Sequence, residues 1–197
     1  MVYRLATKEW FTARISACAL IADTDFTKIT NEKKEQHIKH FAALCRDDVP
    51  MVRRVAAQNI GKLLQNIVQS TTDINGSMEM ISDTFLTIYE ELSLAEQPDS
   101  IRLQTAENCI HFGNALFTLQ QNNLPDNEID NEKENALLQR ILPLVEVGCD
   151  DRSWRVRWTA ASKFGDLIKA FSNFQGPMDK LIPSYEKLLQ DPEAEVR

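Results

Sequence analysis

Apolar residues recur along this chain at helical spacing, in segments separated by short polar turns. Between residues 35 and 45 they lie close to one stripe of a helix, and a second stripe runs from Val52 to Ile67. A period near 3.6 with polar residues between the apolar ones is typical of an amphipathic helix packed on one side. This part of the sequence therefore predicts two helices joined by a tight turn.

The same arrangement is repeated further along the chain. Apolar stripes predict helix pairs at 78–94 with 100–119 and at 133–147 with 153–171, followed by a single first helix at 178–189. Residues 9–22 have the pattern of a second helix without a first one. The chain is therefore expected to consist of stacked helix pairs.

A short motif recurs in the turns: an acid, four spacer residues, an aliphatic residue and an arginine. The acids are Asp47, Glu96, Asp151 and Asp191, and the arginines are Arg53, Arg102, Arg157 and Arg197. Successive arginines are 49, 55 and 40 residues apart. The shortest spacing matches the period of about 40–47 residues of HEAT and armadillo arrays, and the longer spacings indicate inserted loops.

These repeats predict an all-α fold, namely a HEAT-repeat α-α solenoid of antiparallel helix pairs stacked in a right-handed superhelix. The predicted units are a partial repeat (second helix) at 1–26, repeats at 27–74, 75–130 and 131–176, and a partial repeat (first helix) at 177–197. The repeat at 75–130 is expected to carry an acidic inserted loop. Because neither end has the polar face of a capping repeat, a central fragment of a longer array is expected.

Composition narrows the classes of function. Acidic residues outnumber basic ones by 29 to 22, a net charge of −7 that disfavours nucleic acid as a partner. No apolar run approaches the roughly 18 residues of a membrane span, and no signal peptide is recognisable, so we expect a cytoplasmic protein that can also occur in the nucleus. The cysteines, expected to be buried reduced thiols, are Cys18, Cys45, Cys109 and Cys149.

Catalytic chemistry has no recognisable constellation in the sequence. His37 and His40 are interpreted as surface residues of a lysine-rich helix, and His111 has no paired acid or nucleophile in its turn. A phosphate-binding loop, a nucleophile elbow and a metal-ligand set are not found. We therefore expect a protein that is not an enzyme and that needs no cofactor or metal.

Three segments resemble consecutive HEAT repeats of the scaffolding A subunits of protein phosphatase 2A, in the same order. They lie at 2–14 (VYRLATKEWFTAR), 47–54 (DDVPMVRR) and 153–157 (SWRVR). The resemblance implies a scaffold that binds an interchangeable regulatory B subunit through the turns inside its repeats. The catalytic phosphatase subunit would bind repeats missing from this chain, and no membrane or obligate homo-oligomer is implied. Segment 95–102 (AEQPDSIR) and the inserted loops depart from the family pattern.

The family also implies a role for the recurrent acids and arginines, as a ladder that links neighbouring turns. A guanidinium has five donors and can satisfy carboxylates on two sides, so Asp47, Arg53, Glu96, Arg102, Asp151, Arg157, Asp191 and Arg197 are predicted to be structural. Direct contact with a partner is the alternative for them.

Partner contact is predicted for turn residues that the apolar stripes do not use. These are Glu9, Trp10, Asp48, Pro50, Met51, Arg54, Ser153, Trp154 and Arg155. Tryptophan and arginine dominate binding hot spots, although packing between repeats is an alternative for Trp10 and Trp154 and the preferred interpretation for Trp158.

Two other classes of function are alternatives. A different HEAT-repeat adaptor, such as a nuclear transport receptor, would bind cargo on its concave face and has no reason to carry DDVPMVRR in a turn. A helical hydrolase would need a catalytic constellation that the sequence lacks.

Overall fold

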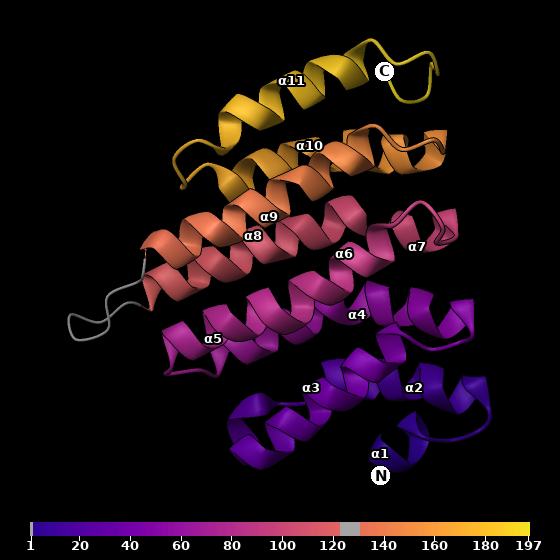
Figure 1. The fold of residues 1–197 in the computed structure, drawn as a ribbon, viewed down its shortest axis with the longest axis vertical. Coiled ribbons are helices and arrows are strands. Elements are labelled where there is room, and N and C mark those ends of the chain that lie inside the picture. The colour runs from indigo at the N-terminus through magenta and orange to yellow at the C-terminus, as the bar shows by residue number, and fades with distance from the viewer. Residues whose placement is uncertain (1, 123–130) are drawn as a thin grey trace.

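The computed structural model describes residues 2–122 and 131–197, and every regular element in these ranges is helical (Figure 1). The elements are α1 (Val2–Ala6), α2 (Phe11–Ala22), η1 (Phe26–Lys28), α3 (Asn31–Cys45), α4 (Pro50–Gln69), α5 (Ile74–Met80), η2 (Ile81–Leu86), α6 (Thr87–Ser93), α7 (Asp99–Arg102), α8 (Thr105–Gln121), α9 (Asn131–Cys149), α10 (Trp154–Phe171) and α11 (Pro177–Leu189). The predicted all-α solenoid is confirmed. The acidic loop expected in the third unit falls largely on residues 123–130, outside the described residues.

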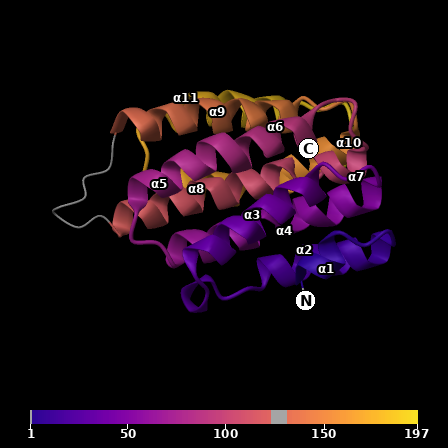
Figure 2. The ribbon, with the colours of Figure 1, turned by 60° about the horizontal axis from the view of Figure 1, so that its bottom comes forward.

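The helix pairs stack in two layers (Figures 1 and 2). The first-helix layer contains α3, α5 with η2 and α6, α9 and α11. The second-helix layer contains α2, α4, α8 and α10, each of which packs along the next. The turns inside the pairs all lie at the same edge of the stack, on the right in Figure 1. We call these turns, at residues 7–10, 46–49, 94–98, 150–153 and 190–192, the turn ridge.

Local sequence explains where several helices begin. The Thr30 hydroxyl accepts a hydrogen bond from the Lys33 amide, so α3 starts before the predicted residue 35. The Asp73 carboxylate accepts one from the Gly76 amide at 2.9 Å and caps α5. Pro50 stands in the first turn of α4, where its missing N–H costs nothing.

The first unit is more complete than predicted. Residues 2–6 form the short helix α1, which packs against both α2 and α3. The Tyr3 ring stacks on His40 with 4.8 Å between centroids, and its hydroxyl lies 3.1 Å from Nδ1 of His37. Residues 2–26 therefore supply part of a first helix as well as a second one.

The third unit contains a π-helical turn, η2, between α5 and α6. Arg140 of α9 reaches this turn and donates from Nη1 to the Ser82 carbonyl oxygen at 2.8 Å. Its Nε and Nη2 each donate to the Glu90 carboxylate at 2.9 Å. A side chain that satisfies backbone freed from regular helical pairing stabilises such a turn. Arg140 thus holds α9 against the third unit.

The core lies between the two layers and is formed by aliphatic and aromatic side chains. Its largest fully buried members include Phe41, Leu44, Ile60, Leu63, Phe85, Phe112 and Phe164. The four cysteines are free and buried, as predicted. Burial raises the pKa of the Cys18 and Cys149 thiols to about 12, so they behave as small apolar groups.

Candidate interaction surface

Arg102 and Asp151 form the most buried contact between neighbouring turns of the ridge. The Arg102 Nε and Nη2 atoms donate to the two carboxylate oxygens of Asp151 at 2.7 and 2.9 Å. The side chains are only 3% and 6% exposed. Nη1 of Arg102 donates to the Gln97 carbonyl oxygen of its own turn. One guanidinium therefore holds its own turn and the next one together.

The same geometry recurs at two other steps of the stack. Arg14 holds Asp47 at 2.6 and 2.9 Å, and Arg157 holds Asp191 at 2.6 and 3.0 Å. Such paired, charge-assisted hydrogen bonds are among the stronger ones in proteins. Arg14 was missed by the sequence analysis because its own turn has Lys8, not an acid, six residues earlier.

Each ladder aspartate also caps its own turn. The backbone N–H groups of Val49, Ser153 and Glu193 donate to Asp47, Asp151 and Asp191 at 2.9, 2.7 and 2.9 Å. Burial opposes ionisation of Asp151, but the hydrogen bonds from Arg102 and the Ser153 N–H outweigh it and lower the pKa of Asp151.

The hydrogen bond from Arg157 is the main cause that lowers the pKa of Asp191, against some desolvation. The pKa of Asp47 is lowered as well, because hydrogen bonds from Arg14 and the Val49 N–H exceed the effect of burial.

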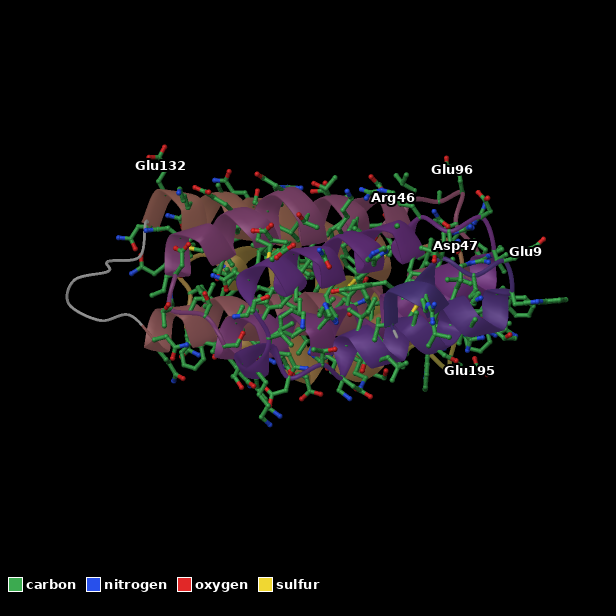
Figure 3. The ribbon with its side chains drawn as sticks, turned by 90° about the horizontal axis from the view of Figure 1, so that it is seen from below. Glu9, Arg46, Asp47, Glu96, Glu132 and Glu195 are labelled. Carbon is green, nitrogen blue, oxygen red and sulfur yellow. The ribbon has the colours of Figure 1, made fainter. Side chains whose placement is uncertain are left out.

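The prediction for Glu96 is wrong, because Glu96 is exposed and points away from the ridge (Figure 3). Arg53 instead donates from Nε to the side-chain oxygen of Gln97 at 3.2 Å, and from Nη1 to the carbonyl oxygen of Asp47 at 2.7 Å. The third turn is one residue shorter: Asp47 precedes Arg53 by six residues, whereas Gln97 precedes Arg102 by five. Counting six residues back from Arg102 therefore selected Glu96 instead of Gln97.

Arg197 repeats half of the ladder geometry. Its Nη1 donates to the Asp191 carbonyl oxygen and, at 3.2 Å, to the Pro192 carbonyl oxygen. These are bonds within its own turn, like those of Arg53 and Arg157.

The predicted partner-binding residues are brought to one edge of the stack. Glu9, Trp10, Asp48, Pro50, Met51, Arg54, Trp154 and Arg155 are exposed on or beside the turn ridge, and Ser153 is half-buried. Figure 3 shows Glu9 projecting outward and Asp47 within the same end of the stack. The backbone of these turns is tied to the ladder arginines, as in the bond from Arg14 to the Glu9 carbonyl oxygen at 2.7 Å, while the side chains face solvent.

Trp158 differs from its predicted packing role. It is 48% exposed, more than Trp154 at 36%. Trp158 follows Arg54 by 104 residues, the same interval that separates Asp151 from Asp47. Aligning the two turns residue by residue therefore places Trp158 at the position of exposed Arg54, a signal that the sequence analysis did not use. The Arg155 guanidinium stacks over the Trp154 ring, 4.9 Å from its centroid.

The histidines have packing contacts. His37, predicted at the surface, is only 7% exposed, and its Nδ1 lies 2.7 Å from the Lys33 carbonyl oxygen. His111 packs against Gly61, where an added Cβ would stand 2.0 Å from the imidazole ring. Burial lowers the pKa of His111. Within residues 2–122 and 131–197, no group of three or more potential metal ligands is gathered.

None of the helices in the described part of the chain is long and apolar enough to cross a bilayer.

Comparison with known sequences supports the fold and the resemblance. The HEAT repeat family matches residues 38–67 and 141–171. A Schizosaccharomyces pombe protein, named as the regulatory A subunit of protein phosphatase PP2A, is 32% identical over 86% of this chain and 24% of its own length. The Saccharomyces cerevisiae protein of the same name is 28% identical over 92% of this chain and 26% of its own length. A Caenorhabditis elegans protein, a probable PP2A regulatory subunit, is 36% identical over 59% of this chain and 18% of its own length.

The chain spans about a quarter or less of the length of these relatives. The matched segments 38–67 and 141–171 cover the α3–α4 and α9–α10 pairs, which are built alike in the structure. The resemblance predicted from the turn motifs is thus confirmed: this is a HEAT-repeat chain related to the regulatory A subunits of protein phosphatase 2A.

Proposed function

We propose that this chain is a non-catalytic scaffold section of a serine/threonine protein phosphatase 2A holoenzyme, and that its turn ridge binds the interchangeable regulatory B subunit. The names of its relatives support the scaffold role. The choice of the turn ridge as the binding surface rests on one observation: the turn residues fall into two groups with different contacts. The ladder residues form ion pairs within the stack, whereas the neighbouring residues expose their side chains to solvent at the same edge.

The exposed turn residues suit a protein partner. Tryptophan and arginine are enriched in interface hot spots. The stacking of Arg155 on Trp154 orients both groups before binding, and pre-ordering of side chains lowers the entropy cost of association. Because the ladder ties each of these turns to the next, Trp10, Arg54 and Trp154 lie along one edge and can be contacted together by one extended partner.

The catalytic phosphatase subunit would bind repeats outside this chain, so the holoenzyme is assembled by a longer array than the residues present. The chain itself would supply a binding position for the B subunit and no chemistry. Its place in the cytoplasm, and also in the nucleus, stays a prediction.

The test is calorimetric binding of a purified regulatory B subunit to this chain and to a double variant, Arg54→Ala with Trp154→Ala. We expect the variant to lose about 2 kcal/mol or more of binding free energy, as removal of hot-spot residues does. Lys180→Ala with Ile182→Ala, which removes an exposed basic and apolar pair on α11 away from the ridge, is the matched control.

Equal binding by the ridge double variant and the α11 double variant would show that the turn ridge is not part of the interface. No binding by a well-folded chain would contradict the proposal and favour the other class of HEAT-repeat adaptor, one that binds cargo on its concave face.

A further inference from the structure

The first helices of the second and third units leave a groove between them at the edge of the stack opposite the turn ridge. Its lining includes Lys34 and Ile38 of α3, and Ser77 and Met80 of α5. Both helices are described in full, and no hydrogen bond or ion pair joins α3 to α5. Nearer the ridge, the same layer has the exposed pair of Arg46 and Glu91. The first-helix side of this junction is therefore loosely held.

The first-helix layer is tied more firmly on both sides of this groove. Toward the N-terminus, the Tyr3 ring of α1 stacks on His40 of α3 with 4.8 Å between centroids. Toward the C-terminus, Arg140 of α9 donates to the Glu90 carboxylate of α6 at 2.9 Å and to the backbone of η2. The groove thus separates two parts of the stack, the first two units and the last three.

The second-helix layer of the same junction is closely packed. The His111 ring of α8 lies so near Gly61 of α4 that an added Cβ would stand 2.0 Å from it. Beside it, the buried Asn108 side chain donates to the Ala57 carbonyl oxygen at 2.9 Å. A close contact along one layer and a groove in the other give this junction the geometry of a hinge, whose axis lies where α4 packs on α8.

The ladder contact across this junction resists bending less than its neighbours do. Arg53 donates to the neutral side chain of Gln97 at 3.2 Å. At the next junction, Arg102 holds Asp151 with two charged hydrogen bonds between side chains that are almost fully buried. Charge-assisted pairs of this kind are stronger and more directional than a single bond to an amide. Motion is therefore expected at the junction of the second and third units rather than at the following one.

We infer that the junction between the second and third units is the hinge of this stack. The last three units swing as one body against the first two, about the contact of His111 with Gly61, while the groove between α3 and α5 narrows and widens. The bend sets the spacing between Trp10 and Arg54 on one body and Trp154 on the other. This consequence for a partner on the turn ridge rests on the proposed function, whereas the hinge itself does not.

Double electron–electron resonance on the full chain, with spin labels on two introduced cysteines, measures the motion. Gln36→Cys on α3 with Gln139→Cys on α9 crosses two junctions that include the hinge. Asp83→Cys in η2 with Glu186→Cys on α11 crosses two junctions without it. All four positions are exposed and the native cysteines are buried, so the label reaches the introduced thiols. We expect the first distance distribution to be about twice as wide as the second.

Gln97→Glu tests the physical cause on both labelled pairs. A carboxylate beside Arg53 adds a charged ladder contact across the hinge, so the first distribution should narrow toward the second, which should not change. Glu96→Gln, exposed and one residue away, is the matched control and should leave both widths unchanged.

Equal widths for the two pairs in the chain without these changes, or a wider second pair, would overturn the hinge. A first pair that Gln97→Glu does not narrow would overturn it as well, because the neutral ladder contact would then not permit the motion. These measurements need no B subunit, so the hinge and the proposed function fail separately.

Discussion

Two neighbouring junctions of this stack are held together by different means. Between the third and fourth units, Arg102 holds Asp151 with two charged hydrogen bonds, and Arg140 fastens α9 to the π-helical turn. Between the second and third units, Arg53 has only the neutral side chain of Gln97 across the ladder, at 3.2 Å. The charged pair at this junction, Arg46 with Glu91, is largely exposed to solvent, and exposed pairs contribute little to stability. A hydrogen bond between a cation and an amide is weaker than a paired bond to a carboxylate.

The junction with the weaker ladder contact is held by the second-helix layer. The His111 ring of α8 packs directly on Gly61 of α4, and the Asn108 side chain donates to the Ala57 carbonyl oxygen at 2.9 Å. A repeat array therefore does not need the same contact at every step. Each junction requires enough close packing or charge pairing in one of its layers.

The largest expected effect is at the junction between the third and fourth units, where Arg102 pairs with Asp151. Asp151→Ala would leave the Arg102 guanidinium buried without its carboxylate, and breaking a buried pair in this way costs about 3–5 kcal/mol. Urea unfolding followed by circular dichroism measures the loss. Replacing both partners, Arg102→Met with Asp151→Leu, should recover much of it. A loss in the single variant as small as that of a surface pair would contradict the assigned burial.

The packed junction is tested by Gly61→Ala. The added methyl would meet the His111 ring, so we expect a loss of about 1–3 kcal/mol by thermal or urea unfolding. Gly165→Ala is the matched control, 104 residues later at the same repeat position, where nothing lies within 4 Å of the added Cβ. Alanine there should stabilise α10 by up to about 1 kcal/mol. If both variants behaved alike, close packing at Gly61 would not support its junction.

Acid should weaken the three aspartate contacts of the ladder before the contact between Arg53 and Gln97. The pKa values of Asp47, Asp151 and Asp191 are lowered in the folded chain, so their contribution to stability is present above the unfolded pKa of about 3.9 and is lost as pH falls through the folded values. We expect the free energy of unfolding to fall below about pH 5. In Asp151→Asn this fall should be shallower, which a series of urea titrations between pH 7 and 3 would detect.

The smallest expected effect comes from adding a charge to the ladder contact between Arg53 and Gln97. Gln97→Glu would place a carboxylate beside half-buried Arg53 and should stabilise the chain by about 0–1 kcal/mol. Glu96→Gln, one residue away and exposed, should change the unfolding midpoint little. A larger effect of Glu96→Gln than of Gln97→Glu would reverse the assignment of the ladder position.

Periodicity predicted most of the fold. The eight predicted helical segments correspond to helices or helix series that the structure places within a few residues of the predicted bounds; they are 9–22, 35–45, 52–67, 78–94, 100–119, 133–147, 153–171 and 178–189. This succeeded because a repeat helix must direct its apolar stripe at its neighbours, and the stripe is visible in the sequence. Breaks inside a unit, such as η2 and the interruption between α7 and α8, were not visible.

The candidate site was predicted less completely. The repeated motif did predict that the site residues lie along one edge of the stack, because equivalent turns must align when equivalent helices stack. The burial of His37 and the partner of Arg53 depend on residues far apart in the chain. A one-residue change in the length of the third turn was enough to exchange Glu96 for Gln97.

The sequence by itself determined the helix pairs, the alignment of their turns and the class of residue at each turn, because these depend on local spacing and on the apolar stripe. Only the tertiary structure decided which arginine holds which neighbour and which aromatic side chains stay in solvent. Hydrogen bonds and burial are set by distances between units, and a shift of one residue changes those distances without changing the pattern that predicts the fold.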